Sequence, residues 1–354
     1  MTSGALVAPS IPPIRGFDHE ELVVRAGPRS GITIVIAVHS TRLGGAMGAC
    51  RTWRYPTRAA AVQDALRLSE SMTYKAAAAG VDAGGGKSVL CLAPGVELDA
   101  PRRRQLFLDF GEMVEGLDGR YFTGQDVGTT PADVAIVAQS TRYVQQAGID
   151  TGPWAAKGVF HSMRACARHV FGDPSLASRR VAVVGLGAVG GNLAHLLADA
   201  GARLVLADID DSRRVLAEQL AATWTTPTAA LTAEVDIVAP CALGGMIDAA
   251  VVDALRSPII CGGANNQLAD LHLAADLMER GVLYAPDFVA NAGGFIYVAA
   301  LRFASEVAEA TVDAEKRTRQ LEEQMGQLIS LGSAEHMTPL EAARQLAGAR
   351  IAAA

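Results

Sequence analysis

The chain has 354 residues, of which 50% are hydrophobic and 19% are charged, and its net charge is −6. This length and composition suit about two globular domains and argue against a largely disordered chain. The scattered lysines and arginines argue against a nucleic-acid partner, and no apolar run reaches the roughly 18 residues that a membrane span requires.

The cysteines and histidines indicate in which compartment the protein is found and whether it binds a metal. The five cysteines are widely spaced, odd in number and form no CxxC pair. This pattern is typical of free thiols in a reducing compartment, so we expect a cytoplasmic protein. The seven histidines form no H-x-x-x-H pair, and we therefore predict no metal site.

The N-terminal part divides into a tail and a first domain. Residues 1–16 contain three prolines and no basic segment, which predicts a flexible tail and not a signal peptide. Residues 17–145 are expected to form an α/β domain. It begins with the β-branched runs LVVRAG and GITIVIAVH, separated by the turn signal PRSG, which predict an antiparallel pair of strands.

A helix, a glycine run and a strand follow in this domain. Apolar residues at helical spacing predict a helix over 58–80, and DAGGGKSVL comes next. Its Gly-Lys-Ser lacks the spacing of a P-loop, and the apolar residues after Lys87 predict a strand where a P-loop needs a helix. We expect Gly84, Gly85 and Gly86 to form a loop that gives a ligand room. Another helix is predicted over 102–117.

The second half of the chain has a different pattern of apolar residues. Over residues 146–300, short apolar runs such as RRVAVVGLG and ARLVLADID alternate with helical stretches. This alternation predicts a doubly wound parallel sheet, the Rossmann type of α/β fold. Residues 301–354 read as helices, and the last of them has a complete start signal in Thr338, Pro339 and Glu341.

A dinucleotide site is predicted after the first strand of this sheet. Gly185, Gly187 and Gly190 form G-x-G-x-x-G between a β-branched strand and a helix, as pyrophosphate binding requires. The next strand ends in Asp208, close to the usual offset of about 20 residues for an acid that binds the ribose 2′-hydroxyl. The motif therefore favours NAD over NADP, although Arg213 and Arg214 lie near enough to weaken that preference.

Six stretches in one order carry a family resemblance: MTYKAAAAGVDAGGGKSV, GQDVGT, VGLGAVGG, APCALGG, GGANNQLAD and LYAPDFVANAGG. Together they resemble the leucine/phenylalanine/valine dehydrogenase branch of the amino-acid dehydrogenases, over about residues 17–350. The resemblance implies reversible, NAD-linked oxidative deamination of an L-amino acid, with an apolar or aromatic side chain, to a 2-oxo acid and ammonia.

The resemblance also assigns residues. Lys87 and Asp126 match the catalytic lysine and aspartate, and Lys75 matches the lysine that binds the substrate carboxylate. Further substrate-binding positions are Gly48, Asn266, Asn291, Met47 and Val289, although Met47 also suits simple packing. The positions expected along NAD, besides the three glycines and Asp208, are Ala188, Val189, Ile209, Cys241, Ala242 and Asn265.

Deamination requires proton transfer near neutral pH, because water must attack the imine carbon and ammonia must leave. A lysine performs this only if its pKa is lowered, by burial or by a second cation. The resemblance therefore implies that Lys87 activates water, that Asp126 exchanges protons with the amine, and that Lys75 orients Cα.

The chain departs from the family pattern in its first substrate loop, at Gly45, Ala49 and Cys50, and in the hinge helix, at Ala155. These changes leave open a diverged enzyme that reduces a nonstandard imine or oxo acid in a biosynthetic pathway. A noncatalytic NAD-binding regulator is a further alternative.

The family architecture implies an active site in a cleft between the two domains, closed by a hinge motion that excludes water. It also implies a homo-oligomer in which the first strands pair across subunits. The helices of residues 301–354 are expected to pack back on the substrate domain.

Overall fold

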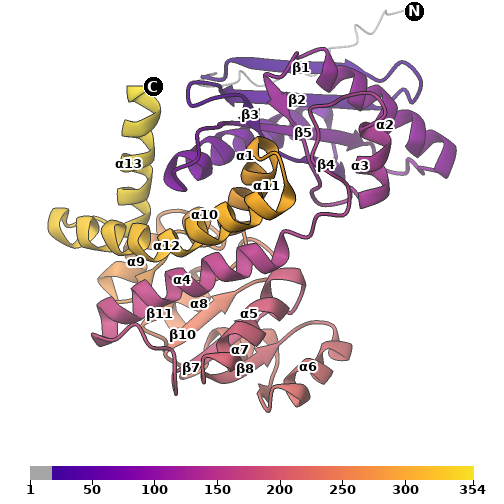
Figure 1. The fold of residues 1–354 in the computed structure, drawn as a ribbon. Helices are drawn as coiled ribbons and strands as arrows, with labels where there is room; N and C mark the ends of the chain where they lie inside the picture. The colour runs from indigo at the N-terminus through magenta and orange to yellow at the C-terminus, as the bar shows by residue number, and fades with distance from the viewer. Residues whose placement is uncertain (1–17) are drawn as a thin grey trace, which may run out of the picture. The chain divides into compact units, whose positions relative to one another are not determined.

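The structure, a computed structural model, describes residues 18–354, so the tail predicted for residues 1–16 lies outside the described part. The chain forms two compact units (Figure 1). The first contains residues 18–73 and 84–148, and the second contains residues 74–83 and 149–354. The predicted domain boundaries are not tested by this division and stay predictions.

The first unit is built on a mixed sheet in the order β1-β2-β5-β3-β6, with β4 also paired to β5. The predicted antiparallel pair is confirmed, because β1 and β2 pair with Leu22 opposite Ala37. The strands are β1 (Glu21–Ala26), β2 (Thr33–Ser40), β3 (Ala46–Met47), β4 (Cys50–Arg54), β5 (Gly84–Leu92) and β6 (Tyr121–Phe122). The helices are α1 (Arg58–Ala78), α2 (Ala100–Glu115) and α3 (Pro131–Val137).

Helices pack on both faces of this sheet. Side chains alternate along each strand, so neighbouring residues are buried on opposite faces. Ile34 and Ile36 of β2 belong to one buried cluster with Phe107 of α2. Val35, from the same strand, belongs to another with Ala65 of α1. This two-sided burial explains why β2 and β5 read as continuous apolar runs and not as alternating ones.

The loop predicted at the three glycines is wrong, because Gly84–Gly86 are the first residues of the buried strand β5. A Cβ on Gly84 would lie 1.9 Å from the carbonyl oxygen of Ser40, and one on Gly85 would lie 2.1 Å from the backbone nitrogen of Thr73. A Cβ on Gly86 would meet the ring of Tyr121. These glycines therefore let the protein's own segments approach β5; they do not make room for a ligand.

The second unit contains the predicted parallel sheet, in the order β12-β11-β10-β7-β8-β9. All its pairings are parallel. In chain order this is the 3-2-1-4-5-6 arrangement of dinucleotide-binding folds, whose order reverses between β7 and β10. The strands are β7 (Arg180–Val184), β8 (Arg203–Ala207), β9 (Thr223–Trp224), β10 (Ile237–Pro240), β11 (Ile259–Ile260) and β12 (Leu283–Tyr284).

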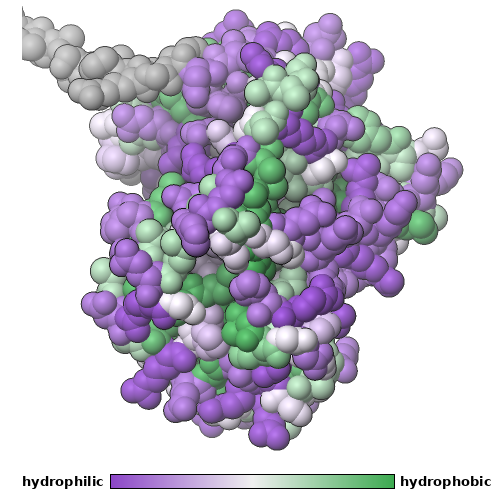
Figure 2. All heavy atoms as spheres, turned by 90° about the vertical axis from the view of Figure 1, so that its left-hand side faces the viewer, coloured by the Kyte–Doolittle hydropathy of each residue, from purple (hydrophilic) through white to green (hydrophobic). Residues whose placement is uncertain are grey.

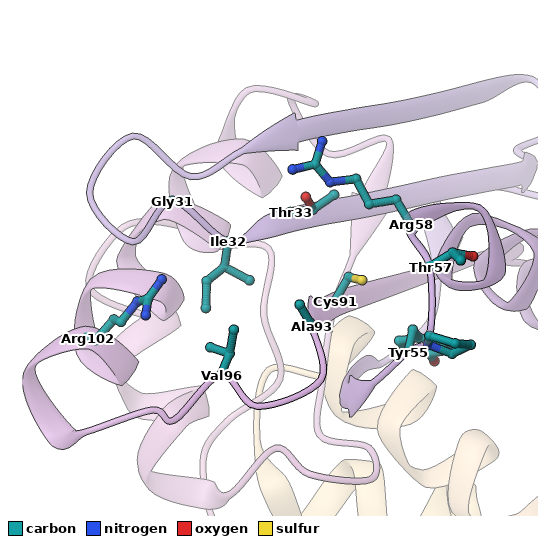
Figure 3. Close-up of a pocket in the computed structure, with 11 residues that line it drawn as sticks. Gly31, Ile32, Thr33, Tyr55, Thr57, Arg58, Cys91, Ala93, Val96 and Arg102 are labelled. Atoms are coloured by element: carbon teal, nitrogen blue, oxygen red, sulfur yellow. The ribbon is translucent and has the colours of Figure 1, made fainter. Parts of the chain in front are cut away.

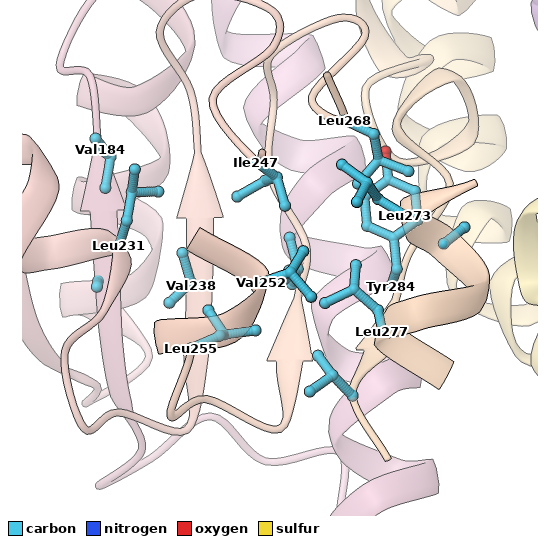
Figure 4. Packing of buried hydrophobic residues seen from close by; sticks show 14 of the residues in the cluster. Val184, Leu231, Val238, Ile247, Val252, Leu255, Leu268, Leu273, Leu277 and Tyr284 are labelled. Atoms are coloured by element: carbon cyan, nitrogen blue, oxygen red, sulfur yellow. The ribbon is translucent and has the colours of Figure 1, made fainter. Parts of the chain in front are cut away.

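Helices cover the second sheet as its crossovers require. On one face, apolar residues of the strands pack with Leu231, Leu255 and Leu277 (Figure 4). The helices are α4 (Gly152–Phe171), α5 (Ala188–Asp199), η1 (Asp211–Arg213), α6 (Arg214–Gln219), α7 (Pro227–Leu231), α8 (Ala249–Ala254), α9 (Leu273–Glu279), α10 (Asp287–Ala290), α11 (Gly293–Phe303), α12 (Val307–Glu335) and α13 (Pro339–Ala353).

The C-terminal helices bear out the predicted start signal. Thr338 and Glu341 form a capping box at the beginning of α13, with Pro339 in the first turn. Near the end of α13, Arg350 donates a hydrogen bond of 2.8 Å to the carbonyl of Ala77 and pairs with Asp82 at 2.7 Å. The last helix is therefore anchored to the C-terminal end of α1, which belongs to the same unit.

The face of the molecule drawn in Figure 2 is mostly polar, with hydrophobic residues interspersed among hydrophilic ones. Among the described residues, no helix is both long and apolar enough to cross a membrane.

Candidate active site

The first unit brings Lys87 and Asp126 into contact. Lys87 lies in β5 opposite Ala37 of β2, and its Nζ is 2.7 Å from Oδ2 of Asp126. The lysine is only 5% exposed. Asp126 belongs to the loop GQDVGT, which is held close to β4 because Thr129 donates a hydrogen bond to the carbonyl of Cys50. The pair is thus a contact between a buried lysine on a strand and a partly exposed aspartate on a loop that is itself hydrogen-bonded in place.

Arg51, which was not predicted as a site residue, also holds Asp126. Its Nε donates to Oδ2 of Asp126 at 3.1 Å, and its Nη1 donates to Asp64 at 3.0 Å. Asp64 also accepts from the hydroxyl of Tyr55. The arginine ends the altered stretch LGGAMGACR, so its place beside that motif was the available sequence signal.

The charges around Asp126 determine its protonation. Burial raises the pKa of this carboxyl group, but the charges of Lys87 and Arg51 outweigh burial and lower the pKa to about 2. Asp126 is therefore a carboxylate at neutral pH, able to hold an ammonium group or to accept a proton.

The second unit brings Lys75, Asn265 and Asn291 together. The Nζ of Lys75 donates to Oδ1 of Asn265 at 3.1 Å, and Nδ2 of Asn291 donates to the same oxygen at 2.9 Å. Within the described part of the chain, the buried Oδ1 of Asn291 has no hydrogen-bond partner. Buried polar atoms rarely stay unsatisfied, so this oxygen suits a ligand donor. Asn266, next in the chain, adopts a left-handed conformation with φ of 52°.

The three motif glycines have different surroundings. Gly185 has φ of +96°, and a Cβ there would lie 2.6 Å from Ala242. A Cβ on Gly190 would lie 1.8 Å from the carbonyl oxygen of Gly185. Gly187, at the start of α5, is exposed, and a Cβ added to it would meet no other heavy atom of the described chain within 4 Å. Two glycines thus allow tight packing, and the third leaves the backbone accessible.

The other predicted cofactor residues gather around this loop, at the carboxyl ends of β7, β8 and β10. Asp208 accepts a hydrogen bond of 2.6 Å from the backbone nitrogen of Leu186. Cys241 follows β10 and accepts from Gly263, and burial raises the pKa of its thiol to about 12. Ala188 is exposed and Val189 half-buried at the start of α5.

Two apolar side chains near the loop are unusually exposed. Ile209, which was predicted, is 91% exposed, and Leu243, which was not, is 78% exposed. Exposed large apolar groups beside a polar loop are typical of ligand sites. Leu243 lies in the stretch APCALGG, so that motif carried the missing signal.

Three of the predicted substrate-binding residues, Met47, Val289 and Gly48, are closely packed. Met47 of β3 is 2% exposed and Val289 of α10 is 0% exposed. A Cβ on Gly48 would lie 1.9 Å from the carbonyl oxygen of Gly86, so Gly48 allows close contact with β5. Their proposed contacts with substrate stay predictions.

A cavity of about 240 Å³ in the first unit is a separate feature (Figure 3). None of the predicted site residues lines it. Its lining is Gly31, Ile32, Thr33, Tyr55, Pro56, Thr57, Arg58, Cys91, Ala93, Val96 and Arg102.

Comparison with known proteins decides the family. The sequence model of Glutamate/Leucine/Phenylalanine/Valine dehydrogenase matches residues 206–354. The model of the Glu/Leu/Phe/Val dehydrogenase dimerisation domain matches residues 21–143. The chain belongs to the Glu/Leu/Phe/Val dehydrogenase family. The predicted resemblance and fold class are confirmed.

Individual relatives place this dehydrogenase in the branch for apolar amino acids. Valine dehydrogenase of Streptomyces virginiae is 44% identical over 291 residues, covering 79% of this chain and 80% of the relative. Leucine dehydrogenase of Thermoactinomyces intermedius is 40% identical over 290 residues, covering 80% and 78%. The crystal structure of L-tryptophan dehydrogenase from Nostoc punctiforme has a TM-score of 0.83 at 36% identity, covering 96% of this chain and 98% of that one.

The chain is therefore an amino-acid dehydrogenase, an oxidoreductase that acts on the CH–NH2 group of its substrate. This membership does not support the alternative of a noncatalytic regulator. Within the dehydrogenase, Lys87 contacts Asp126 in one unit, and in the other unit Lys75 and Asn291 both donate to Asn265. The catalytic roles of these residues are proposals.

Proposed function

We propose that the protein catalyses the reversible, NAD-linked oxidative deamination of an L-amino acid with an apolar or aromatic side chain. The products are the 2-oxo acid and ammonia. The observation that carries the proposal is the contact of 2.7 Å between buried Lys87 and Asp126. Valine, leucine and tryptophan dehydrogenases among the relatives support the class of side chain.

Lys87 and Asp126 are proposed to transfer protons. Lys87, which pairs with Asp126 as an ammonium in the resting protein, first releases its proton to solvent. Its neutral amine then takes a proton from the water that attacks the substrate carbon, and Asp126 passes this proton to the leaving amine, so that ammonia departs. Arg51 holds Asp126 through its Nε contact at 3.1 Å. Because two cations face one carboxylate, Asp126 stays ionised and keeps the lysine in position.

Lys75 is proposed to bind the substrate carboxylate. Its hydrogen bond to Asn265 fixes the ammonium group at the end of its flexible side chain, and Asn291 fixes Asn265 in turn. Buried Asp287 also acts on this ammonium: burial raises the pKa of Asp287, and the charge of Lys75 lowers it. Because hydrogen bonding already restricts the side chain of Lys75, binding a substrate carboxylate costs less conformational entropy than it would for a freely rotating lysine.

The residues of the second unit fit NAD. The exposed backbone at Gly187 and the first amides of α5 suit a pyrophosphate, and Asp208 suits the ribose hydroxyls. The unsatisfied Oδ1 of Asn291 suits a donor such as the carboxamide of nicotinamide. When bound, NAD supplies the acceptor for the hydride that leaves Cα.

A diverged substrate is a second candidate because of the changed first loop. One of the three changed residues, Cys50, does not face that loop's surface, however. Cys50 is 1% exposed and belongs to the apolar core of the first unit, so the expectation that it alters the substrate loop is not supported. Ala49 and Gly45 remain the two changes in this loop that support a diverged substrate.

A homo-oligomer in the cytoplasm completes the proposal. The matching family model is named for dimerisation, and β1 is an edge strand of its sheet, with Val24 45% exposed. Edge strands offer unpaired backbone groups to a second copy. Light scattering of the purified protein tests the assembly, and a monomer would contradict it. The cytoplasmic location stays a prediction from the free thiols.

The test of function is NADH formation with a panel of L-amino acids at alkaline pH. We expect turnover of aliphatic or aromatic substrates and a loss of about 10²–10⁴-fold in kcat for Lys87→Ala, with NAD binding kept. Lys316→Ala, at an exposed position of α12, is the matched control and should retain full activity. Normal turnover by Lys87→Ala would refute the proposed mechanism, and turnover of only nonstandard imines or oxo acids would favour the second candidate.

A further inference from the structure

Three side chains able to ligate a metal meet at the open end of the first hairpin, apart from the residues proposed for catalysis. They are Asp18 and His19, just before β1, and His39, near the end of β2. One ligand atom from each lies within 4.8 Å of the other two. The two rings are in edge-to-face contact at 4.7 Å between centroids, and their side chains are only 6% and 12% exposed.

Hydrogen bonds to α1 fix the tautomer of His19. Its Nε2 lies 3.0 Å from the carbonyl oxygen of Leu66 and 3.0 Å from Oγ of Ser69. The carbonyl can only accept, and the serine hydroxyl already donates its proton to that carbonyl. Nε2 must therefore carry the proton. In the neutral ring, the lone pair of Nδ1 then faces Oδ1 of Asp18 at 3.1 Å.

His39 is fixed in the same way. Its Nδ1 lies 2.8 Å from Oγ1 of Thr73, whose proton goes to the carbonyl of Ser69. Nδ1 is therefore the donor, and the lone pair of Nε2 is directed to Oδ2 of Asp18, 3.7 Å away.

Two imidazole lone pairs and a carboxylate thus converge, and in the neutral rings neither of the nitrogens that face Asp18 carries a proton. Such an arrangement is repulsive unless a positive charge lies among the three groups. A proton on Nδ1 of His19 would join only that ring to Asp18. A divalent ion could serve all three groups, and each imidazole already donates its other N–H to an oxygen, as metal-bound histidines do.

We propose that Asp18, His19 and His39 bind one divalent transition-metal ion of the zinc class, with water completing the coordination. Two imidazoles and a carboxylate suit such an ion. The contacts with Asp18 are within the spacing expected between ligands of a tetrahedral ion with bonds of about 2.0–2.1 Å. The ion would tie the chain before β1 to β2 and, through the imidazole hydrogen bonds, to α1.

No sequence motif indicates this site, because its ligands lie on two segments that only the hairpin brings together. Residues 18 and 19 meet residue 39 through the antiparallel pairing of β1 with β2. The search for two histidines four residues apart, on which the prediction of no metal site depended, cannot detect such a site.

The test uses full-length protein without a polyhistidine tag, freed of metal by a chelator. Zinc is titrated by calorimetry, and cobalt by its visible absorption. We expect one ion per chain and a higher Tm with zinc. His39→Ala and His19→Ala should each lower the zinc affinity at least about 100-fold, and Thr73→Val, which removes the acceptor for His39, about 10-fold.

Matched controls separate this site from adventitious binding. His272 contacts Asp270 at 2.7 Å in an exposed cluster with Asp276, and His272→Ala should leave zinc binding unchanged. Asp18→Asn, at a 67% exposed side chain, should weaken binding with little effect on folding.

Three outcomes would overturn the site. They are an absence of stoichiometric binding to the folded protein, binding undiminished in both histidine variants, and a cobalt spectrum with thiolate charge-transfer bands. Each would leave an ordinary ion pair, with a proton on His19, as the account of the cluster. None of these outcomes bears on amino-acid turnover.

Discussion

Two stretches of this chain concentrate glycine, residues 84–86 before Lys87 and residues 185–191 after β7. In the first, every added Cβ would collide with the protein's own atoms, and the glycines lie inside a strand. In the second, Gly185 and Gly190 are equally crowded, but Gly187 faces open space. The glycines before Lys87 thus allow close packing, whereas those of residues 185–191 allow close packing and also leave the backbone accessible at Gly187.

The comparison also separates two ways of building a site. Around Lys87, β5 is crowded so that a charged side chain can be held beside Asp126 in the interior. At Gly187, the missing side chain leaves the backbone accessible, as the proposed contact with the pyrophosphate requires. Substitutions in the first stretch should therefore damage folding, and substitutions at Gly187 should damage binding.

The largest effect is expected for Gly85→Ala. Its Cβ would lie 2.1 Å from the backbone nitrogen of Thr73, and backbone cannot move aside cheaply. We expect a loss of about 3 kcal/mol in the free energy of unfolding, measured by urea denaturation. Gly348→Ala in α13 is the control, because an added Cβ there would meet no described residue within 4 Å beyond its own helix turns, and it should stabilise by up to about 1 kcal/mol. Equal stability of the two variants would contradict the packing role.

A second prediction concerns the acid that holds Lys87. The pKa of Asp126 is lowered to about 2 from the ordinary 3.8, despite burial, by Lys87 and Arg51. The folded state therefore binds fewer protons than the unfolded state between these values. The stabilisation is complete above about pH 5 and is lost as the pH falls toward 2. It amounts to about 2 kcal/mol.

Urea denaturation of the wild type and of Asp126→Asn at several pH values measures this contribution. The difference in unfolding free energy between them should shrink steadily from about pH 5 to about pH 3. Glu279→Gln, at an exposed position of α9, should show no comparable trend. A difference that is constant with pH would refute the predicted charge coupling around Asp126.

The third prediction concerns the open glycine. Gly187→Ala should cost less than about 1 kcal/mol of stability, because its Cβ would meet no heavy atom of residues 18–354 within 4 Å and only the helix start is affected. It should nevertheless raise the Kd for NADH about tenfold or more, since the methyl group would occupy the approach of the pyrophosphate. Fluorescence titration measures this, and an unchanged Kd would place the pyrophosphate elsewhere.

Local patterns sufficed for much of the fold. The β-branched runs, the alternation of strands and helices and the start signal at Thr338 were all confirmed. The glycine run was predicted wrongly because sequence shows where a side chain is missing but not which atoms approach. Arg51 was missed for a related reason: its contact with Asp126 joins β4 to a distant loop. The proposed metal ligands Asp18, His19 and His39 were missed for the same reason, because only the register of β1 against β2 brings them together.

The smallest effect is expected for Asp208→Asn, which keeps an oxygen for the hydrogen bond from Leu186 and removes only the charge. The carboxylate should repel a 2′-phosphate by about 1 kcal/mol in this partly exposed place. The ratio of kcat/KM for NAD to that for NADP should therefore fall about fivefold. Asp210→Asn is the matched control, because Asp210 is exposed and its side chain accepts from Ser212 at the start of η1. If both substitutions changed the ratio equally, the general field of the loop, not Asp208, would determine cofactor choice. If neither did, Arg213 and Arg214 would be the residues to substitute next.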